Sequence, residues 1–220
     1  MGFDPKVYRM ACKEYTRKWA LVDRVLYNLR RAHPGHSDPL EVAAKLWIVG
    51  RTYAAGIERQ LKAGGTQGSS LPKVRDFIIQ SHKDVAQITS SLKDVREPLS
   101  IDSLSMIVQQ HGAFIRLLEA IDGLDGTPRS FVSKYLHFHV PAVPIFDSIA
   151  QDELTRLYRW RPDFQVFPRT DTMEEDYYRY CCRFWRLHAD IRVSGAQLTV
   201  KLIDFYLTFS SEANRHPANR

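Results

Sequence analysis

An all-α fold is predicted for this chain on three observations. Apolar residues recur at steps of three and four along most of the sequence, which is the period of a helix buried on one side. Helix-start residues precede several of these segments, and alternating strand patterns are scarce, with only Phe164–Phe167 resembling a strand. The 220 residues suffice for one domain, expected as lobes over 1–100 and 101–210 that share a cleft, with a frayed tail over 211–220.

The first half of the chain is expected to hold three helices. Apolar periodicity predicts one helix from Val7 to Leu29. Asp38 is a good N-cap and is followed by a proline suited to a first turn, so a second helix is predicted over Pro39–Lys62. Glycine and serine predict a flexible loop over Ala63–Pro72, and a third helix is expected near residues 73–92.

The second half is expected to hold five helices. Three of them are predicted near residues 101–121, 129–139 and 148–159. Thr172 and Glu175 have the spacing of a capping box, which predicts a helix continuing to about residue 189. Ser194 is expected to cap the last helix, which should end near Phe209.

Charge and cysteine content narrow the class of protein. Thirty-one Lys and Arg against 25 Asp and Glu give a formal charge of +6, so a polyanion such as nucleic acid is the first partner to consider. The cysteines, Cys12, Cys181 and Cys182, form neither a disulfide framework nor a zinc spacing, which fits a reduced cytoplasmic compartment. An 18-residue apolar run is absent, so membrane insertion is not expected.

Patterns for cofactors and metals are missing as well. The sequence has no P-loop, dinucleotide glycine pattern, G-x-S-x-G or H-E-x-x-H, so no cofactor is expected. His137 and His139 would point in different directions on a helix, so no metal site is expected. An obligate protein partner is not indicated.

One stretch, Ser130–Ser148 (SFVSKYLHFHVPAVPIFDS), concentrates the polar residues that suggest chemistry. On a helix its polar residues share one face, which is either solvated or lines a site: Ser130, Ser133, Lys134 and His137. Pro141 and Pro144 then favour an extended segment. Asp147 follows at the N-cap position of the next helix, where it is either a plain cap or a functional carboxylate.

The turn before this helix is a candidate anion site. Thr127 is expected to cap the helix, with Pro128 at its first position. Free N–H groups from Gly126 onward, the helix dipole and Arg129 would together favour a phosphate.

The order of turn, helix, proline-containing segment and aspartate at a helix start resembles the helix-hairpin-helix DNA glycosylase superfamily. The segment VPAVPIFDS is particularly similar to the segment before the catalytic aspartate of 8-oxoguanine glycosylases, and the resemblance covers about residues 120–155. KLWIVGRTYAAGIERQ and RSFVSKYLHFH also resemble uncharacterised bacterial proteins, some of them glycosylase-like and associated with phage defence.

The resemblance implies a helical DNA glycosylase-like fold, with two lobes around a basic cleft. It implies an enzyme that cleaves the N-glycosidic bond of a damaged or modified base flipped out of double-stranded DNA. Asp147 would stabilise the oxocarbenium ion or orient water. The role would be base-excision repair or removal of modified bases from invading DNA.

Two departures from the family leave alternatives open. Pro128 replaces the second glycine of the hairpin pattern, and Arg129 occupies the usual place of the Schiff-base lysine in bifunctional members. Lys134 is therefore a shifted nucleophile, a phosphate or base contact, or a solvated residue. A monofunctional enzyme that uses water needs no such lysine.

Further contacts are expected outside this stretch, each with a structural alternative. Arg51 and Tyr53 either share a face near a bound strand or belong to an ordinary helix surface. Arg159 and Arg161, interleaved with aromatic residues, either hold phosphates or rim a packed loop. The competing hypothesis for the whole chain is a non-enzymatic helical module that binds nucleic acid or a protein.

Overall fold

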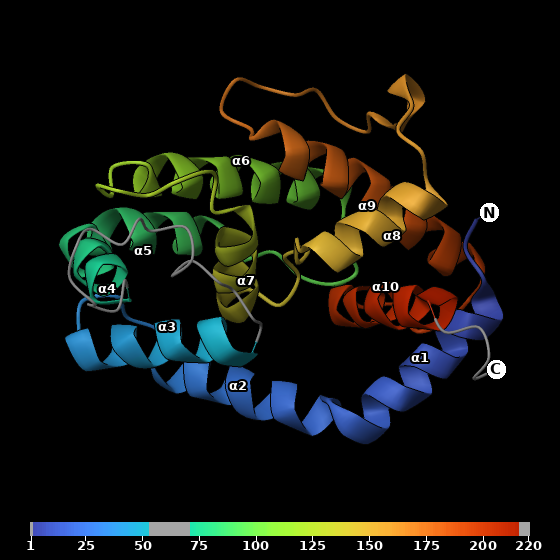
Figure 1. Ribbon diagram of the computed structural model, residues 1–220, viewed down its shortest axis with the longest axis horizontal. Helices are drawn as coiled ribbons and strands as arrows, with labels where there is room; N and C mark the ends of the chain where they lie inside the picture. The colour runs from blue at the N-terminus through green and yellow to red at the C-terminus, as the bar shows by residue number, and fades with distance from the viewer. Residues whose placement is uncertain (1, 53–70, 216–220) are drawn as a thin grey trace.

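The computed structural model describes residues 2–52 and 71–215, and within them the chain is helical, which confirms the all-α prediction (Figure 1). The first five helices are α1 (Pro5–Lys18), α2 (Ala20–Ala32), α3 (Pro39–Thr52), α4 (Leu71–Gln80) and α5 (His82–Ser91). The remaining five are α6 (Ile101–Leu118), α7 (Arg129–His139), α8 (Ser148–Leu157), α9 (Glu175–Val193) and α10 (Val200–Arg215). The strand expected at Phe164–Phe167 is wrong, because Phe164 ends a short 3-10 turn, Pro162–Phe164, and no described residue is in a strand.

Two expected helices are each broken into a pair. The helix predicted from Val7 to Leu29 ends at Lys18 and restarts at Ala20, and the helix predicted over 73–92 is divided at Ser81. The first break has a packing reason, since α1 lies against α10 whereas α2 lies against α7. Residues 53–62 of the helix predicted from Pro39, and most of the loop after it, lie outside the described residues.

Two cap predictions and one predicted helix end in the second half are corrected. Glu174, and not Thr172, caps α9, because its carboxylate accepts hydrogen bonds from the backbone N–H groups of Asp176 and Tyr177 at 3.2 and 2.8 Å. Ser194 ends α9 as its C-cap and does not start the last helix. That helix, α10, continues past the predicted end to Arg215, so residues 211–215 are helical and not frayed.

Helix α7 lies at the centre of the molecule. Helices α2 and α3 contact it from one side and α6 from the other, while α8 packs between α9 and α10 (Figure 1). Every residue from 131 to 140 is buried. Ser133, Lys134 and His137 of α7 therefore lie inside the protein, which excludes a solvated role for Lys134, exposed by only 5%.

The predicted lobes contact each other extensively. Helix α1 packs on α10, α2 and α3 both pack on α7, and α5 packs on α6.

Among the described residues, none of the helices combines the length and apolar character that a membrane crossing requires.

Candidate active site

Helix α7 holds the extended segment that follows it, residues 140–146, through two of its polar side chains. The backbone N–H of Phe146 donates to Ser133 Oγ at 3.0 Å. His137 Nδ1 lies 2.8 Å from the carbonyl oxygen of Val143. Because a carbonyl oxygen only accepts, Nδ1 of His137 carries the proton.

Helix α9 holds the same segment from the other side. The Tyr177 hydroxyl donates to the carbonyl oxygen of Pro144 at 2.8 Å, and the Tyr180 hydroxyl donates to that of Ile145. Both tyrosines are fully buried. Side chains from two helices thus fix the backbone immediately before Asp147, where the prolines exclude a regular helix.

The structure gives His137 a positioning role. Its Nε2 accepts from the Tyr27 hydroxyl at 2.7 Å. Burial lowers the pKa of His137 to about 3, and the nearby charge of Lys201 acts in the same direction. A neutral imidazole with both nitrogens engaged fixes the chain before Asp147. Ser133 and His137, expected to contact substrate, are buried away from the cavity described below.

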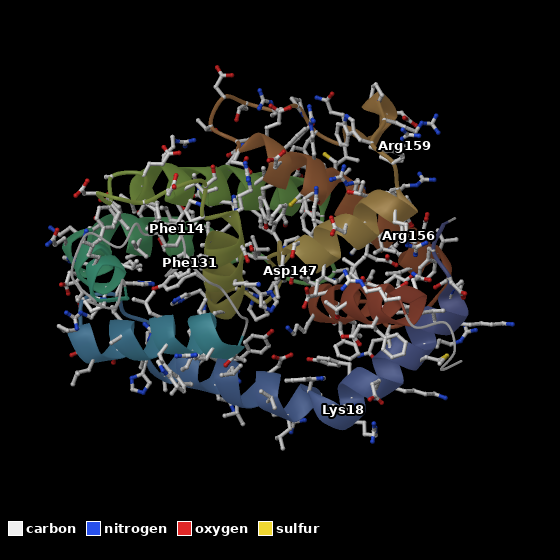
Figure 2. The ribbon with its side chains drawn as sticks, in the orientation of Figure 1. Lys18, Phe114, Phe131, Asp147, Arg156 and Arg159 are labelled. Carbon is white, nitrogen blue, oxygen red and sulfur yellow. The ribbon has the colours of Figure 1, made fainter. Side chains whose placement is uncertain are left out.

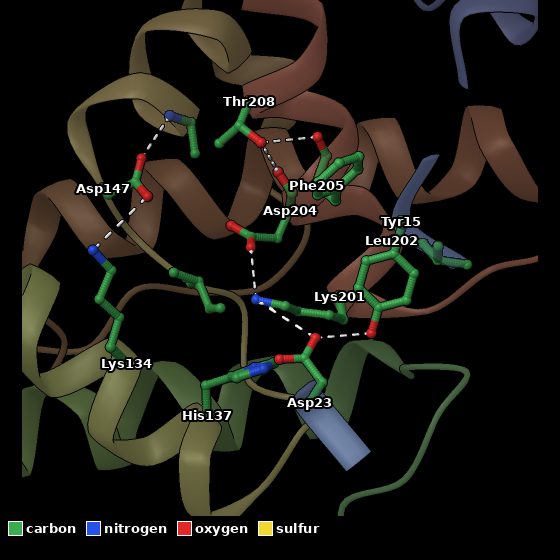
Figure 3. Close-up of polar contacts among 12 residues, drawn as sticks. Tyr15, Asp23, Lys134, His137, Asp147, Lys201, Leu202, Asp204, Phe205 and Thr208 are labelled. Atoms are coloured by element: carbon green, nitrogen blue, oxygen red, sulfur yellow. Dashed lines mark hydrogen bonds and ion pairs between the residues drawn. The ribbon is translucent and has the colours of Figure 1, made fainter. Parts of the chain in front are cut away.

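Asp147 has two partners, one for each carboxylate oxygen (Figure 3). Its Oδ1 accepts from the backbone N–H of Ala150 at 2.8 Å, which confirms the predicted N-cap of α8. Its Oδ2 lies 3.8 Å from Lys134 Nζ. The carboxylate is half-buried, so it is both a cap and a charged group facing a lysine.

A cavity of about 510 Å³ opens beside Lys134 and Asp147. Asp147 lies near the centre of the view in Figure 2. This volume lies within the range of small-molecule sites, roughly 300–1,000 Å³. Helices α1 and α10 and the α1–α2 junction contribute four aromatic residues to its wall: Tyr15, Trp19, Phe205 and Phe209. A planar ring would find apolar partners there.

The cavity wall is not basic. Acidic side chains outnumber lysines five to three among its described lining residues: Glu14, Asp23, Asp147, Asp204 and Glu212 against Lys18, Lys134 and Lys201. The expectation of a basic cleft around Asp147 is therefore wrong for this part of the wall. Its charge favours a group that is neutral or positively charged.

A polar network on the wall opposite Lys134 was not predicted from the sequence (Figure 3). Lys201 Nζ lies 3.3 Å from Asp204 Oδ2 and 4.0 Å from Asp23 Oδ2. The Tyr15 hydroxyl donates to Asp23 Oδ2 at 2.8 Å. One signal was present in the sequence, since Lys201 and Asp204 are an i, i+3 pair inside the apolar segment of α10.

Asp204 is a buried carboxyl group of the cavity with a raised pKa. Burial raises its pKa, the Asp147 carboxylate adds to that rise, and Lys201 opposes it. Its Oδ1 is buried and has no hydrogen-bond partner in residues 2–52 and 71–215. A carboxyl group in this position is suited to holding a proton.

The turn before α7 differs from the expected anion site. Pro128 occupies the N-cap position of α7, which no side chain caps, so Thr127 is not the cap. Arg129 Nε and Nη2 each lie 2.8 Å from a carboxylate oxygen, of Glu174 and Asp176 respectively. The Nε–H is not aligned for a hydrogen bond, so that contact is an ion pair.

The remaining predicted contacts lie around the molecule. Gly126 is exposed in a turn with φ +76°, and half-buried Ser130 accepts from Ser133 Oγ through its carbonyl at 3.1 Å. Arg51 is exposed at the end of α3, next to cavity-lining Thr52. Tyr53 lies outside the described residues.

Two predicted DNA contacts belong to the loop after α8. Arg159 and Arg161 are exposed, and Arg161 Nε lies 3.2 Å from Asp163 Oδ1. Arg159 is at the periphery in Figure 2, far from the central Asp147 in that view. Neither arginine lines the cavity.

The chemistry of the site rests on carboxylates and lysines. Within the residues described, no group of three or more His, Cys, Asp and Glu side chains is arranged to hold a metal ion. Comparison with known proteins gives no match to a family model and no significant match to a curated protein or a solved structure.

Proposed function

We propose that this protein is a DNA glycosylase that releases a damaged or modified base through Asp147. The observation that carries the proposal is the pairing of Asp147 and Lys134 at 3.8 Å in the wall of a cavity with aromatic lining. A flipped base has the size and shape for such a cavity, where it would lie against aromatic rings. The order of turn, helix, proline segment and aspartate supports the same assignment.

The acidic character of the cavity wall suits the cleavage of an N-glycosidic bond. As the N-glycosidic bond breaks, its electron pair leaves with the base and the sugar becomes positively charged at C1′. Asp147 stabilises this cation or orients water toward it, and the excess of carboxylates acts in the same direction. Water adds its oxygen to C1′, one of its protons passes to a carboxylate, and the departing base takes up a proton.

Two of the three roles considered for Lys134 remain. It is buried, so it is either a nucleophile that attacks C1′ as the neutral amine or a group that contacts Asp147 and the substrate. Its position opposite Asp147 Oδ2 favours the second role, because an ammonium group paired with a carboxylate has no free electron pair. We therefore propose a monofunctional enzyme that uses water.

The experiment is an incubation of the protein with duplex DNA carrying a panel of damaged and phage-type modified bases. Abasic sites are scored after alkali treatment, and a parallel reaction contains borohydride. We expect base release without a trapped protein–DNA adduct. An adduct that disappears in Lys134→Gln would instead make Lys134 the nucleophile.

A negative result in this experiment would favour the alternative function. No release from any substrate, together with salt-dependent DNA binding that is unchanged in Asp147→Asn, would favour a non-enzymatic helical binding module. In that case Asp147 would serve only as the cap of α8.

A further inference from the structure

A second cavity, of about 500 Å³, concentrates positive charge at the C-terminal end of α2. Four basic residues line it, from α2 and the α5–α6 connection: Arg30, Arg31, Lys93 and Arg96. The one carboxylate of its described wall, Glu97, accepts a hydrogen bond from the backbone N–H of Val200. Basic residues thus outnumber acidic ones in this wall, whereas the reverse holds around Asp147.

Within the described part of the chain, these basic groups have no acidic partners. Among the described residues none of the four forms an ion pair with a carboxylate. Arg96 donates to the backbone carbonyl oxygens of Lys93 and Val95, and Arg31 donates to the side chain of Asn28. Like charges gathered without counter-charges repel one another, and a bound anion would relieve that repulsion.

Two buried polar groups of the cavity wall have no partner among the residues that the structure describes. Arg30 Nε is buried without a hydrogen-bond acceptor, and so is Nε2 of His139, a residue that is only 2% exposed. Leaving a buried polar group unpaired costs about 1–3 kcal/mol. Burial lowers the pKa of both side chains, and neighbouring positive charges lower it further.

The rest of the wall is apolar. It is formed by the end of α7 and the extended segment after it, with Phe138, Val140 and Ala142 beside Val95. A small inorganic anion would fill little of 500 Å³. A phosphate ester fits better, because arginines hold the phosphate while the apolar wall contacts its organic part.

We propose that this cavity, the α2 anion pocket, binds the phosphate group of a phosphate ester. The ester is either a backbone phosphate of DNA or a free phosphorylated small molecule. The pocket is separate from the Asp147 cavity, but α2 and α7 contribute to both. Tyr27 lines the anion pocket, and its hydroxyl contacts His137, which holds the segment before Asp147.

The test compares Arg30→Gln/Arg96→Gln with a control of equal charge change, Arg9→Gln/Lys13→Gln, on the exposed side of α1. In one arm, thermal unfolding is followed against inorganic phosphate and adenosine monophosphate at constant ionic strength. In the other, the affinity for a labelled duplex is measured over a range of salt concentrations. Arg96→Gln, which changes an exposed residue only, replaces the double variant if that variant unfolds.

A free ester and DNA give different results. If the ligand is a free ester, phosphate and the nucleotide stabilise the wild type, and the pocket variant binds them at least tenfold more weakly than the control. If it is DNA, the salt slope of duplex binding falls by about 0.9 for each phosphate lost. Equal behaviour of pocket and control variants in both arms would overturn the proposal. Neither arm requires base release, so its outcome is independent of the proposed enzyme activity.

Discussion

At the scale of single residues, Asp147 is the cap of α8 and also the carboxylate to which we assign base release. A cap is satisfied by its helix, whereas a catalytic carboxylate must keep an oxygen available. Here Oδ1 caps α8 and Oδ2 faces Lys134 and the cavity. The backbone before it is fixed by Ser133 and His137, so the carboxylate is held in place by neighbours that do not reach the cavity.

Ser133→Ala tests this positioning. The backbone N–H of Phe146 would lose its acceptor, which we expect to lower the free energy of unfolding by about 1–3 kcal/mol. Base release should slow, with DNA affinity unchanged, because Asp147 would move. Urea unfolding and single-turnover release measure the two effects.

Ser91→Ala is the control for Ser133→Ala. The Ser91 hydroxyl donates within its own helix, to the carbonyl oxygen of Gln87 at 2.8 Å. Its removal should leave stability within about 0.5 kcal/mol of the wild type. Unchanged release by Ser133→Ala, at a measured loss of stability, would show that this hydrogen bond does not position Asp147.

At the scale of elements, local signals predicted some boundaries and missed others. The sequence predicted α7 at its observed bounds and Asp147 as the cap of α8, because prolines and a capping aspartate act within a few residues. It missed the breaks at Trp19 and Ser81. The first of these depends on packing against different partner helices, which no local pattern encodes.

The contact between α6 and the segment before α9 has no space for a side chain at Gly112. A Cβ there would lie 2.1 Å from the carbonyl oxygen of Thr172 and 3.2 Å from the backbone N of Glu174. Both neighbours are backbone atoms, so Gly112→Ala must displace the start of α9. We expect it to cost about 1–3 kcal/mol of stability, measured by urea unfolding.

Gly50→Ala is the matched control, with the opposite expected sign. Gly50 lies within α3, and no described atom comes within 4 Å of its added Cβ. Alanine in a helix is favoured over glycine by up to about 1 kcal/mol. A Gly112→Ala variant as stable as Gly50→Ala would show that α6 and the segment before α9 do not approach each other this closely.

At the scale of the whole molecule, part of the candidate site was predictable and part was not. Asp147 and Lys134 lie 13 positions apart in one stretch (147 − 134), so local reasoning brought them together. Asp204, Lys201 and Asp23 come from α10 and α2, and only the packing of the helices places them at the same cavity. Net charge predicted a basic surface but not its location.

Buried neutral histidines make the fold sensitive to acid. Burial lowers the pKa of five of them, to about 3 or 4 where a value is defined: His36, His111, His137, His139 and His188. In the unfolded chain each would titrate near 6.5. Between these values only the unfolded state binds the proton, so stability is present above about pH 6.5 and is lost as the pH falls.

The expected loss is steep. For every pH unit below its unfolded pKa, each such histidine lowers the free energy of unfolding by about 1.4 kcal/mol. Urea unfolding at pH 7.5, 6.0 and 5.0 should therefore give a marked fall in the free energy of unfolding. A constant value over this range would mean that the imidazoles are not buried as described.

The most direct test of the central claim, that the Asp147 carboxylate performs base release, compares Asp147→Asn with Asp38→Asn. Both aspartates cap helices, Asp38 through the backbone N–H groups of Leu40 and Glu41, and asparagine caps about as well. The two variants thus lose the same charge at similar helix positions, and only Asp147 lines the cavity.

The measurement is the single-turnover rate of base release, on the substrate that the wild type cleaves. We predict that Asp147→Asn slows release by roughly 100-fold or more while Asp38→Asn remains close to the wild type. Equal rates for the two variants would contradict a catalytic role for Asp147 and leave it as the cap of α8.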